Sequence, residues 1–278
     1  MEHWNDWIIA NEKTLRLWFF IGILGTMAIW EYLAPRRART QSMAVRWGSN
    51  FALVFLNTAI IRFVLPILAV GTALWAERTG FGLLHWFEGG LLWKVIFTII
   101  FLDFIVYWQH RVFHMIPMFW KLHRMHHADL DYDVTLGSRF HPIEILVSML
   151  LKMAIVALLG LPAAGVILFE IILNGTAMFN HSNVGLPKRI EPWVRAVLVT
   201  QDMHRVHHSI KPEEHNHNFG FALSVWDRIF GSYTAEPSEG QTGMTIGLPY
   251  FRDPRELYLD RMVTQPFREP ASEPAKDA

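Results

Sequence analysis

Eight histidines lie in three short motifs whose spacing suits a metal site. One motif is a His-x-x-x-His pair and two are His-x-x-His-His triplets, with the members His110, His114, His123, His126, His127, His204, His207 and His208. Helical residues three and four positions apart share a face, so each motif can direct its imidazoles to one point. Neutral imidazole is a common ligand of Fe, Zn, Cu and Ni. A single histidine is more often a hydrogen-bonded core residue, but three such clusters favour metal. Because eight candidates exceed the four ligands of one tetrahedral ion, the sequence predicts two metal ions.

Asp103 and Tyr107 extend the first histidine motif toward the N-terminus. With His110 and His114 they stand at i, i+4, i+7 and i+11, which is one narrow stripe on a helix. Ionisable residues inside apolar helices usually mark function. We predict that Asp103 orients a ligand histidine or fixes its tautomer. The competing interpretation is an aspartate that is bonded to a neighbouring helix.

The composition indicates a membrane protein. The chain has 278 residues, of which 52% are hydrophobic and 18% charged, whereas soluble proteins carry about 25% charged residues. The net charge is zero and no basic block is present, so we expect no nucleic-acid partner. The absence of cysteine excludes disulfides, iron–sulfur clusters and thiolate metal sites.

Five apolar runs predict an all-α, multi-pass membrane helical bundle. They cover residues 15–33, 48–75, 91–108, 143–159 and 166–179, and about 20 helical residues cross a bilayer core. Arg62 and Pro66 interrupt the second run, which predicts a kink or tilt. Residues 81–93 are aromatic and broken by glycine, so we expect an interfacial segment. The last two runs are short for full crossings and could form a helical hairpin.

The expected organisation has three parts. Residues 1–94 would hold the N-terminal membrane helices and the interfacial segment, residues 95–235 the histidine-motif domain, and residues 236–278 a C-terminal extension. The last dozen residues are rich in Glu and Pro and are expected to be disordered. Asp129, Asp131 and Asp133 lack the glycine and glutamate of a calcium-binding loop, so we expect a solvated face there.

Basic residues follow the first, third and fifth runs, whereas the opposite ends are nearly free of them. Since basic flanks face the cytoplasm, the N-terminus would face out. Every histidine motif would then lie in a cytoplasmic cap holding the di-metal site, at a bacterial inner membrane or its equivalent.

The order of the motifs resembles the fatty acid hydroxylase superfamily, also called the sterol desaturase family. Three further segments share this resemblance, which covers roughly residues 95–235: Arg139-Phe-His141-Pro-Ile-Glu144, Asn180-His181-Ser-Asn183, and Asn218-Phe-Gly220 with the later Ser224-Val-Trp-Asp-Arg-Ile-Phe-Gly-Ser-Tyr233. The resemblance implies an integral membrane, non-haem di-iron oxygenase that hydroxylates or desaturates a lipid.

The resemblance also implies cofactors and partners. These are two Fe²⁺ ions, dioxygen as co-substrate, a lipid substrate, and electrons from a separate electron-transfer protein or reductase, since the fused haem-binding domain of some eukaryotic members is absent. His181 would join the eight motif histidines as a metal ligand, and His141, His215 and His217 could be ligands or neighbours of ligands. Outer carboxylates such as Asp103, Glu144 or Asp202 would balance the metal charge.

Rival functions remain open at this stage. A metal-binding or metal-transport membrane protein also needs histidines, but near the middle of the membrane and with carboxylates. A b-type cytochrome needs only two histidines for each haem, and a zinc hydrolase would show His-Glu-x-x-His, which this sequence lacks. Fatty acyl chains, sterols or hopanoids, carotenoids and alkyl ethers all suit the implied reaction.

Overall fold

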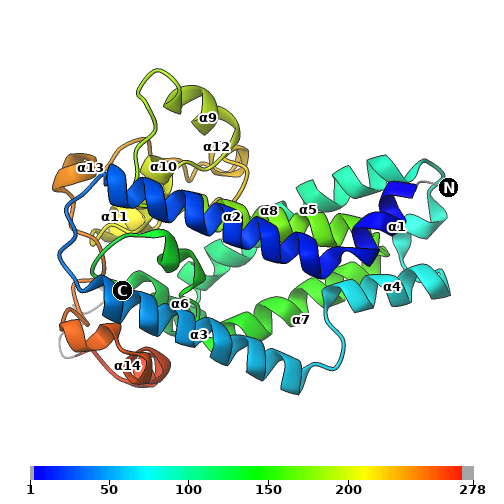
Figure 1. The fold of residues 1–278 in the computed structure, drawn as a ribbon, viewed down its shortest axis with the longest axis horizontal. Helices are drawn as coiled ribbons and strands as arrows, with labels where there is room; N and C mark the ends of the chain where they lie inside the picture. The colour runs from blue at the N-terminus through cyan, green and yellow to red at the C-terminus, as the bar shows by residue number, and fades with distance from the viewer. Residues whose placement is uncertain (1–2, 271–278) are drawn as a thin grey trace.

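The structure, a computed structural model, describes residues 3–270, and in this range it is built from helices and two isolated β-bridges without a strand (Figure 1). Five segments are long and apolar enough to cross a membrane: Glu12–Leu33, Met43–Trp86, Leu91–Met115, Pro142–Leu159 and Ala163–Asn180. The prediction of an all-α, multi-pass membrane bundle is therefore confirmed. The disorder expected for the last dozen residues lies, from residue 271 onward, outside the described range.

The long helices run side by side along the long axis of the molecule (Figure 1). They and the segments between them are α1 His3–Ala10, α2 Glu12–Leu33, α3 Met43–Val64, α4 Ala69–Thr79, η1 Leu83–Trp86, α5 Leu91–Met115, α6 Pro117–His127, η2 Val134–Ser138, α7 Pro142–Leu159 and α8 Ala163–Asn180.

Short helices gather at one end of this bundle, opposite the N-terminus (Figure 1). They are α9 Glu191–Val197, α10 Gln201–His207, α11 Pro212–His215, α12 Val225–Ile229, α13 Gly240–Gly243, η3 Pro254–Leu257, α14 Leu259–Thr264 and η4 Gln265–Phe267. We call α6 together with residues 181–270 the cap.

The sequence sets the helix boundaries by familiar means. The kink expected at Pro66 is a complete break between α3 and α4. α7 begins where the His141 side chain accepts a hydrogen bond from the Ile143 N–H at 3.2 Å, and it ends at Gly160, whose φ of 63° favours glycine. α8 then returns as the second arm of the expected hairpin, and each arm is ~27 Å long.

The centre of the bundle is packed with apolar side chains. Leu102 of α5, Val156 of α7 and Phe169 of α8 are at most 1% exposed and belong to one cluster with residues of α4. Because lipid is as apolar as these side chains, tight packing and internal hydrogen bonds hold such helices together, rather than removal from water. Large apolar side chains such as Phe63, 92% exposed, cover the outer surface.

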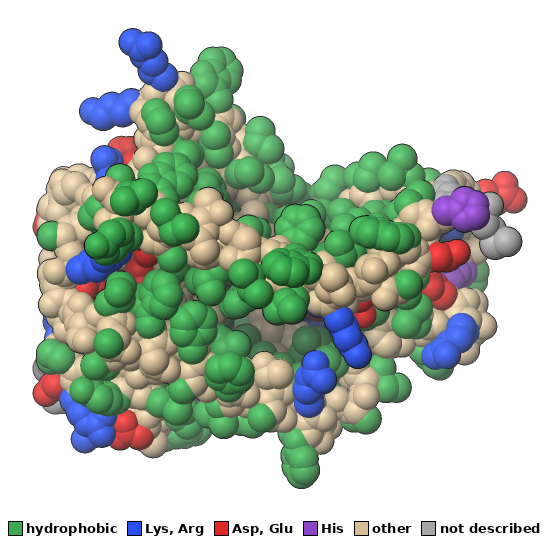
Figure 2. All heavy atoms as spheres, in the orientation of Figure 1, with side chains coloured by type: hydrophobic (Ala, Val, Ile, Leu, Met, Phe, Trp, Pro, Cys, Tyr) green, Lys and Arg blue, Asp and Glu red, His purple; other side chains and the backbone are tan. Residues whose placement is uncertain are grey.

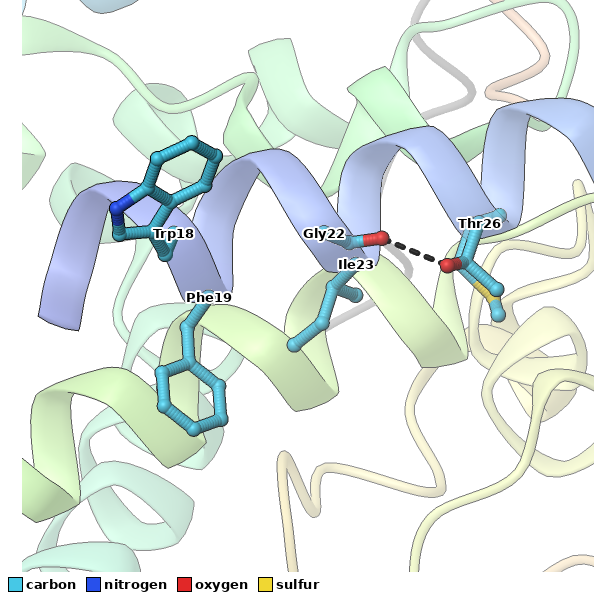
Figure 3. A pocket seen from close by; sticks show the side chains of 6 residues that line it. Trp18, Phe19, Gly22, Ile23 and Thr26 are labelled. Carbon is cyan, nitrogen blue, oxygen red and sulfur yellow. Dashed lines mark hydrogen bonds between the residues drawn. The ribbon is translucent and has the colours of Figure 1, made fainter.

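A shallow hollow on the outer face of α2 is part of this apolar surface (Figure 3). Trp18 and Phe19 line it and are 66% and 51% exposed. The Thr26 hydroxyl donates to the Gly22 carbonyl at 2.7 Å and is thereby satisfied within the helix. The hollow offers no charged group or metal ligand.

Three aspartates that we expected on a solvated face are buried, so that expectation is wrong. Asp129, Asp131 and Asp133 are 0%, 9% and 1% exposed. Arg46 of α3 donates to Asp129 at 2.8 Å and also pairs with Asp133, and Arg139 lies 3.5 Å from Asp129. Buried carboxylates and guanidinium groups compensate one another, and this network fastens α3 to the segment between α6 and α7.

Candidate metal centre

Nine histidines come together in two adjoining groups where the bundle meets the cap. The five-histidine group is His110, His114, His123, His127 and His207, and the four-histidine group is His126, His181, His204 and His208. Within each group the candidate ligand atoms lie within 4.8 Å of one another. The rings of His127 and His208 connect the groups, with centroids 4.6 Å apart. These are the nine positions singled out in the sequence; their role as ligands remains a prediction.

Local helix geometry brings the motifs together. His110 and His114 lie one turn apart near the C-terminal end of α5, and a break at Ile116 with Pro117 starting α6 turns the chain back over them. His181 ends α8, and α10 begins at Thr200, whose side chain caps the helix by accepting from the Met203 N–H. Four helices thus deliver their histidines to one place.

Five of the nine histidines have an outer hydrogen-bond partner for Nδ1. The acceptors are the Phe219 carbonyl for His110, the Asn216 amide oxygen for His114, Glu144 for His123, the Ala177 carbonyl for His181, and the His217 carbonyl for His207. The distances are 2.7 Å, or 3.2 Å for Asn216. Carbonyl and carboxylate oxygens only accept, so Nδ1 carries the proton and Nε2 keeps a lone pair. Such outer partners fix the tautomer and ring direction of metal ligands.

The inner nitrogens face one another in an arrangement that suits a shared cation. Nε2 of His110 lies 3.0 Å from Nε2 of His123, although both Nδ1 atoms already carry the proton. His181 Nε2 lies 3.2 Å from His126 Nε2 and 3.1 Å from His204 Nε2. Among the described residues, Nε2 of His114, His127 and His207 and both nitrogens of His208 are buried without a hydrogen-bond partner. Burying unpaired lone pairs is costly, so these residues fit a metal centre.

The electrostatics favour neutral rings. Burial lowers the pKa of His181 to about 3. Burial, followed by the nearby histidines, holds the pKa values of His126, His127, His204, His207 and His208 well below the usual value. The imidazoles are therefore deprotonated in the form that binds metal.

The three carboxylates considered in the sequence have different positions. Glu144 is 4% exposed and contacts the five-histidine group through His123. Asp202 instead binds Arg205 and Arg36 at 2.5 and 3.2 Å. Glu144 is thus the carboxylate that the structure brings to the histidines.

Asp103 lies elsewhere than expected. Its carboxylate accepts from the backbone N–H groups of Ala222 and Leu223 and from the Trp226 indole, at 3.2, 3.1 and 2.8 Å. In the part of the chain that is described, it bonds to no histidine. The predicted role, orienting a ligand histidine or fixing its tautomer, is therefore not served by a direct hydrogen bond, because the carboxylate bonds to the loop after residue 218. Asp103 holds the loop whose Phe219 carbonyl orients His110.

The three histidines whose role as ligands the sequence left open lie outside the two histidine groups. His141 caps α7, as described, and donates from Nε2 to the Val263 carbonyl at 3.1 Å. His215 bonds to the Ser209 carbonyl at 3.1 Å, and its ring stacks on Trp120 beside the five-histidine group. His217 contributes the carbonyl that orients His207.

Asn216 and Asp227 support the centre but were not selected from the sequence. Asp227 accepts from the N–H groups of Phe219 and Gly220, both at 2.8 Å, so it holds the Phe219–Gly220 peptide group whose carbonyl binds His110. A Cβ at Gly220 would lie 2.8 Å from the Asp227 carboxylate, which leaves room only for glycine. The segments Asn218-Phe-Gly220 and Trp226-Asp227 were singled out for their resemblance to the family. Nothing in the sequence indicated that they bond to each other.

A cavity of about 570 Å³ leads from the histidines into the bundle. His110, His123 and Glu144 line one end, and the side chains toward the middle, such as Leu102 and Val106, are apolar. Figure 2 shows the hollow on the face where α2 and α3 lie in Figure 1, with basic side chains beside it. A long apolar molecule could therefore reach the five-histidine group from within the membrane.

Comparisons with known proteins agree on one family. Residues 95–232 match the family model described as fatty acid hydroxylase. An ornithine lipid hydroxylase of Rhizobium tropici is 25% identical over 83% of this chain and 71% of that protein. Human lathosterol oxidase is 24% identical over 81% of this chain and 73% of that protein. Alkylglycerol monooxygenase of Xenopus tropicalis is 28% identical over 62% of this chain but only 37% of its own length. No solved structure matches.

Proposed function

Because residues 95–232 belong to the fatty acid hydroxylase family, we propose that this chain is an integral membrane, non-haem di-iron oxygenase of lipids. It uses dioxygen to hydroxylate or desaturate a C–H bond of its substrate. Relatives named as a lipid hydroxylase, a monooxygenase and a sterol desaturase support this reaction class. The observation that carries the proposal is the pair of buried histidine groups at one end of a largely apolar cavity.

The geometry supports separate roles for the metal ions and for the side chains of the chain. The five-histidine and four-histidine groups would hold one iron each. With dioxygen as oxidant, the bound ions would supply the chemistry for attacking an unactivated C–H bond, which no side chain performs alone. The chain fixes the rings through their Nδ1 partners, and Glu144 holds His123 at 2.7 Å. The imidazole ligands of both groups are neutral and do not offset the charge of the metal ions. Glu144, which is 4% exposed and bonds to His123, offsets part of that charge.

Positioning and exclusion of water are the other roles of the chain. Phe113, Phe140 and Phe221 line the cavity next to His110 and His123, so a substrate carbon there is surrounded by apolar side chains. A closed apolar site keeps water from competing with the C–H bond. The substrate would enter laterally from the lipid, and a separate electron-transfer protein would supply electrons to the cap.

Metal analysis of protein purified without oxygen tests the proposal. We expect about two irons per chain and no haem absorption band. Incubation with dioxygen, a reductant and membrane lipids should then yield a lipid that has gained one oxygen or lost two hydrogens. A Soret band would indicate a cytochrome, and stoichiometric zinc without iron would count against an oxygenase. Metal uptake into sealed vesicles without lipid oxidation would indicate a transporter.

A further inference from the structure

The end of the cavity remote from the histidines is cationic. Lys13 and Arg16 of α2, Arg62 of α3 and Lys152 of α7 line it, together with the carboxylates Glu12 and Glu170. Four basic side chains against two acidic ones leave an excess of two positive charges.

Internal ion pairs use two of the four cations. Glu170 accepts from Arg16 at 2.6 Å and from Lys152 at 2.6 Å, and Arg16 also binds Glu12 at 2.9 Å. These four side chains form a linear chain of alternating charge, in the order Glu12, Arg16, Glu170 and Lys152, between α2, α7 and α8. They therefore contribute shape and polarity to this end of the cavity but little net charge.

Lys13 and Arg62 carry the excess. Both are exposed, and within residues 3–270 neither forms an ion pair. They come from two different helices, α2 and α3, and line the same cavity. Two cations from different helices thus border one largely apolar cavity without an ion pair in the described range, and this shared position favours a common ligand.

The space between the two ends suits a hydrocarbon chain. Its walls are mostly apolar, with the side chains of Val54, Ile61, Leu102, Ile105, Val106 and Leu173. On α7, Lys152 lies two turns beyond Glu144, which is ~12 Å along the helix. A molecule that fills the cavity therefore needs a long apolar body with its charged group at one end.

We propose that the cavity binds a lipid with an acidic headgroup, a phosphate or a carboxylate, held by Lys13 and Arg62. Its hydrocarbon chain runs past Leu102 toward His110 and His123. The identity of the reacting carbon rests on the proposed function: it lies within the hydrocarbon chain, at the end of the cavity away from the headgroup. The headgroup preference itself does not depend on oxygenation.

The test compares binding of acidic and neutral lipids to the full chain in a neutral detergent. The probes are phosphatidylglycerol, oleic acid and a diacylglycerol with matched chains, and native mass spectrometry measures the bound fraction. We expect phosphatidylglycerol, oleic acid or both to bind about 3- to 10-fold more tightly than diacylglycerol, as two partly exposed ion pairs would give. Comparing phosphatidylglycerol with oleic acid shows whether the site prefers a phosphate or a carboxylate headgroup.

The double variant Lys13→Gln/Arg62→Gln should lose this preference while its affinity for diacylglycerol stays the same. Arg78→Gln is the matched control, because Arg78 is exposed on neighbouring α4 but does not line the cavity. Equal binding of acidic and neutral lipids to the parent chain would overturn the inference, as would an equal loss in the control. Binding with the expected preference but no oxygenation would count against the proposed function alone.

Discussion

A histidine that binds metal needs a fixed tautomer and a fixed direction for its lone pair. For His110, His181 and His207 a backbone carbonyl supplies both, so no side-chain substitution removes the bond. For His123 the partner is the Glu144 side chain. The outer support of the centre can therefore be tested by mutation most directly at Glu144.

Glu144→Gln should weaken metal binding without unfolding the protein. The amide oxygen can still accept from His123 Nδ1, but the negative charge that favours a cation is lost. Mutation of such an outer partner typically costs about 10- to 100-fold in metal affinity, which a chelator competition assay would measure. Glu77→Gln is the control, because Glu77 accepts from the Ala163 N–H in α4–α8 packing and belongs to neither histidine group. Equal losses in both variants would contradict a specific role for Glu144.

One substitution in each histidine group tests the ligand assignment. His207→Ala removes an inward nitrogen from the five-histidine group and His126→Ala removes one from the four-histidine group. We expect each variant to lose lipid oxidation, and its iron content to fall from about two per chain to about one. His85→Ala should keep both, since His85 is exposed in η1, away from the centre. Full activity with full iron in either group's variant would show that the assignment is wrong.

At the scale of elements, the sequence predicts what is periodic and local. The apolar runs predict the long helices, and the i, i+3, i+4 spacing predicts which histidines share a face. The sequence also indicated an interruption at Pro66, expected as a kink or tilt, and a turn at Gly160. All nine histidines that were selected lie in the two groups.

What the sequence could not predict depends on distant partners. Asp129 and Asp133 looked like a polar loop because Arg46, which compensates them, is 83 and 87 positions away. Asp103 looked like a partner of a ligand histidine, but its carboxylate accepts hydrogen bonds from the N–H groups of Ala222 and Leu223, some 120 positions later. Carbonyl acceptors such as Phe219 carry no side-chain signature at all. Only the folded chain reveals these contacts.

Arg46→Met tests the buried network that fastens α3 to the segment after α6. The substitution keeps the volume of the side chain but leaves Asp129 and Asp133 with less compensation. Breaking one partner of a buried ion network costs about 3–5 kcal/mol of unfolding free energy, measurable by denaturant titration in detergent. Arg255→Met is the control, because its ion pair with Asp260 is largely exposed, and it should change stability far less. Similar losses in both variants would show that burial does not set the cost.

At the scale of the whole molecule, the bundle separates two kinds of surface. Seven of the nine histidines lie in the cap, and His110 and His114 lie beside it at the end of α5. Basic residues follow α2 and α8 at this end of the molecule, such as Arg36, Arg37 and Lys188. At the opposite end, the segment of residues 80–90 contains Glu88 and no lysine or arginine, although Lys13 and Arg62 border the cavity at that end. Since basic flanks stay in the cytoplasm, the proposed orientation places the cap there, where soluble electron donors are available.

The absence of native cysteine makes this orientation testable with single-cysteine variants. Glu213→Cys places a thiol on exposed α11 of the cap, and Glu88→Cys places one at the opposite end, where the side chain is also exposed. A membrane-impermeant maleimide applied to sealed spheroplasts should label the Glu88→Cys variant and leave the Glu213→Cys variant unlabelled. Permeabilisation should make both react, and the parent chain should react in neither condition. Labelling of the Glu213→Cys variant alone before permeabilisation would place the cap outside, and the electron donor would then have to be an extracytoplasmic protein.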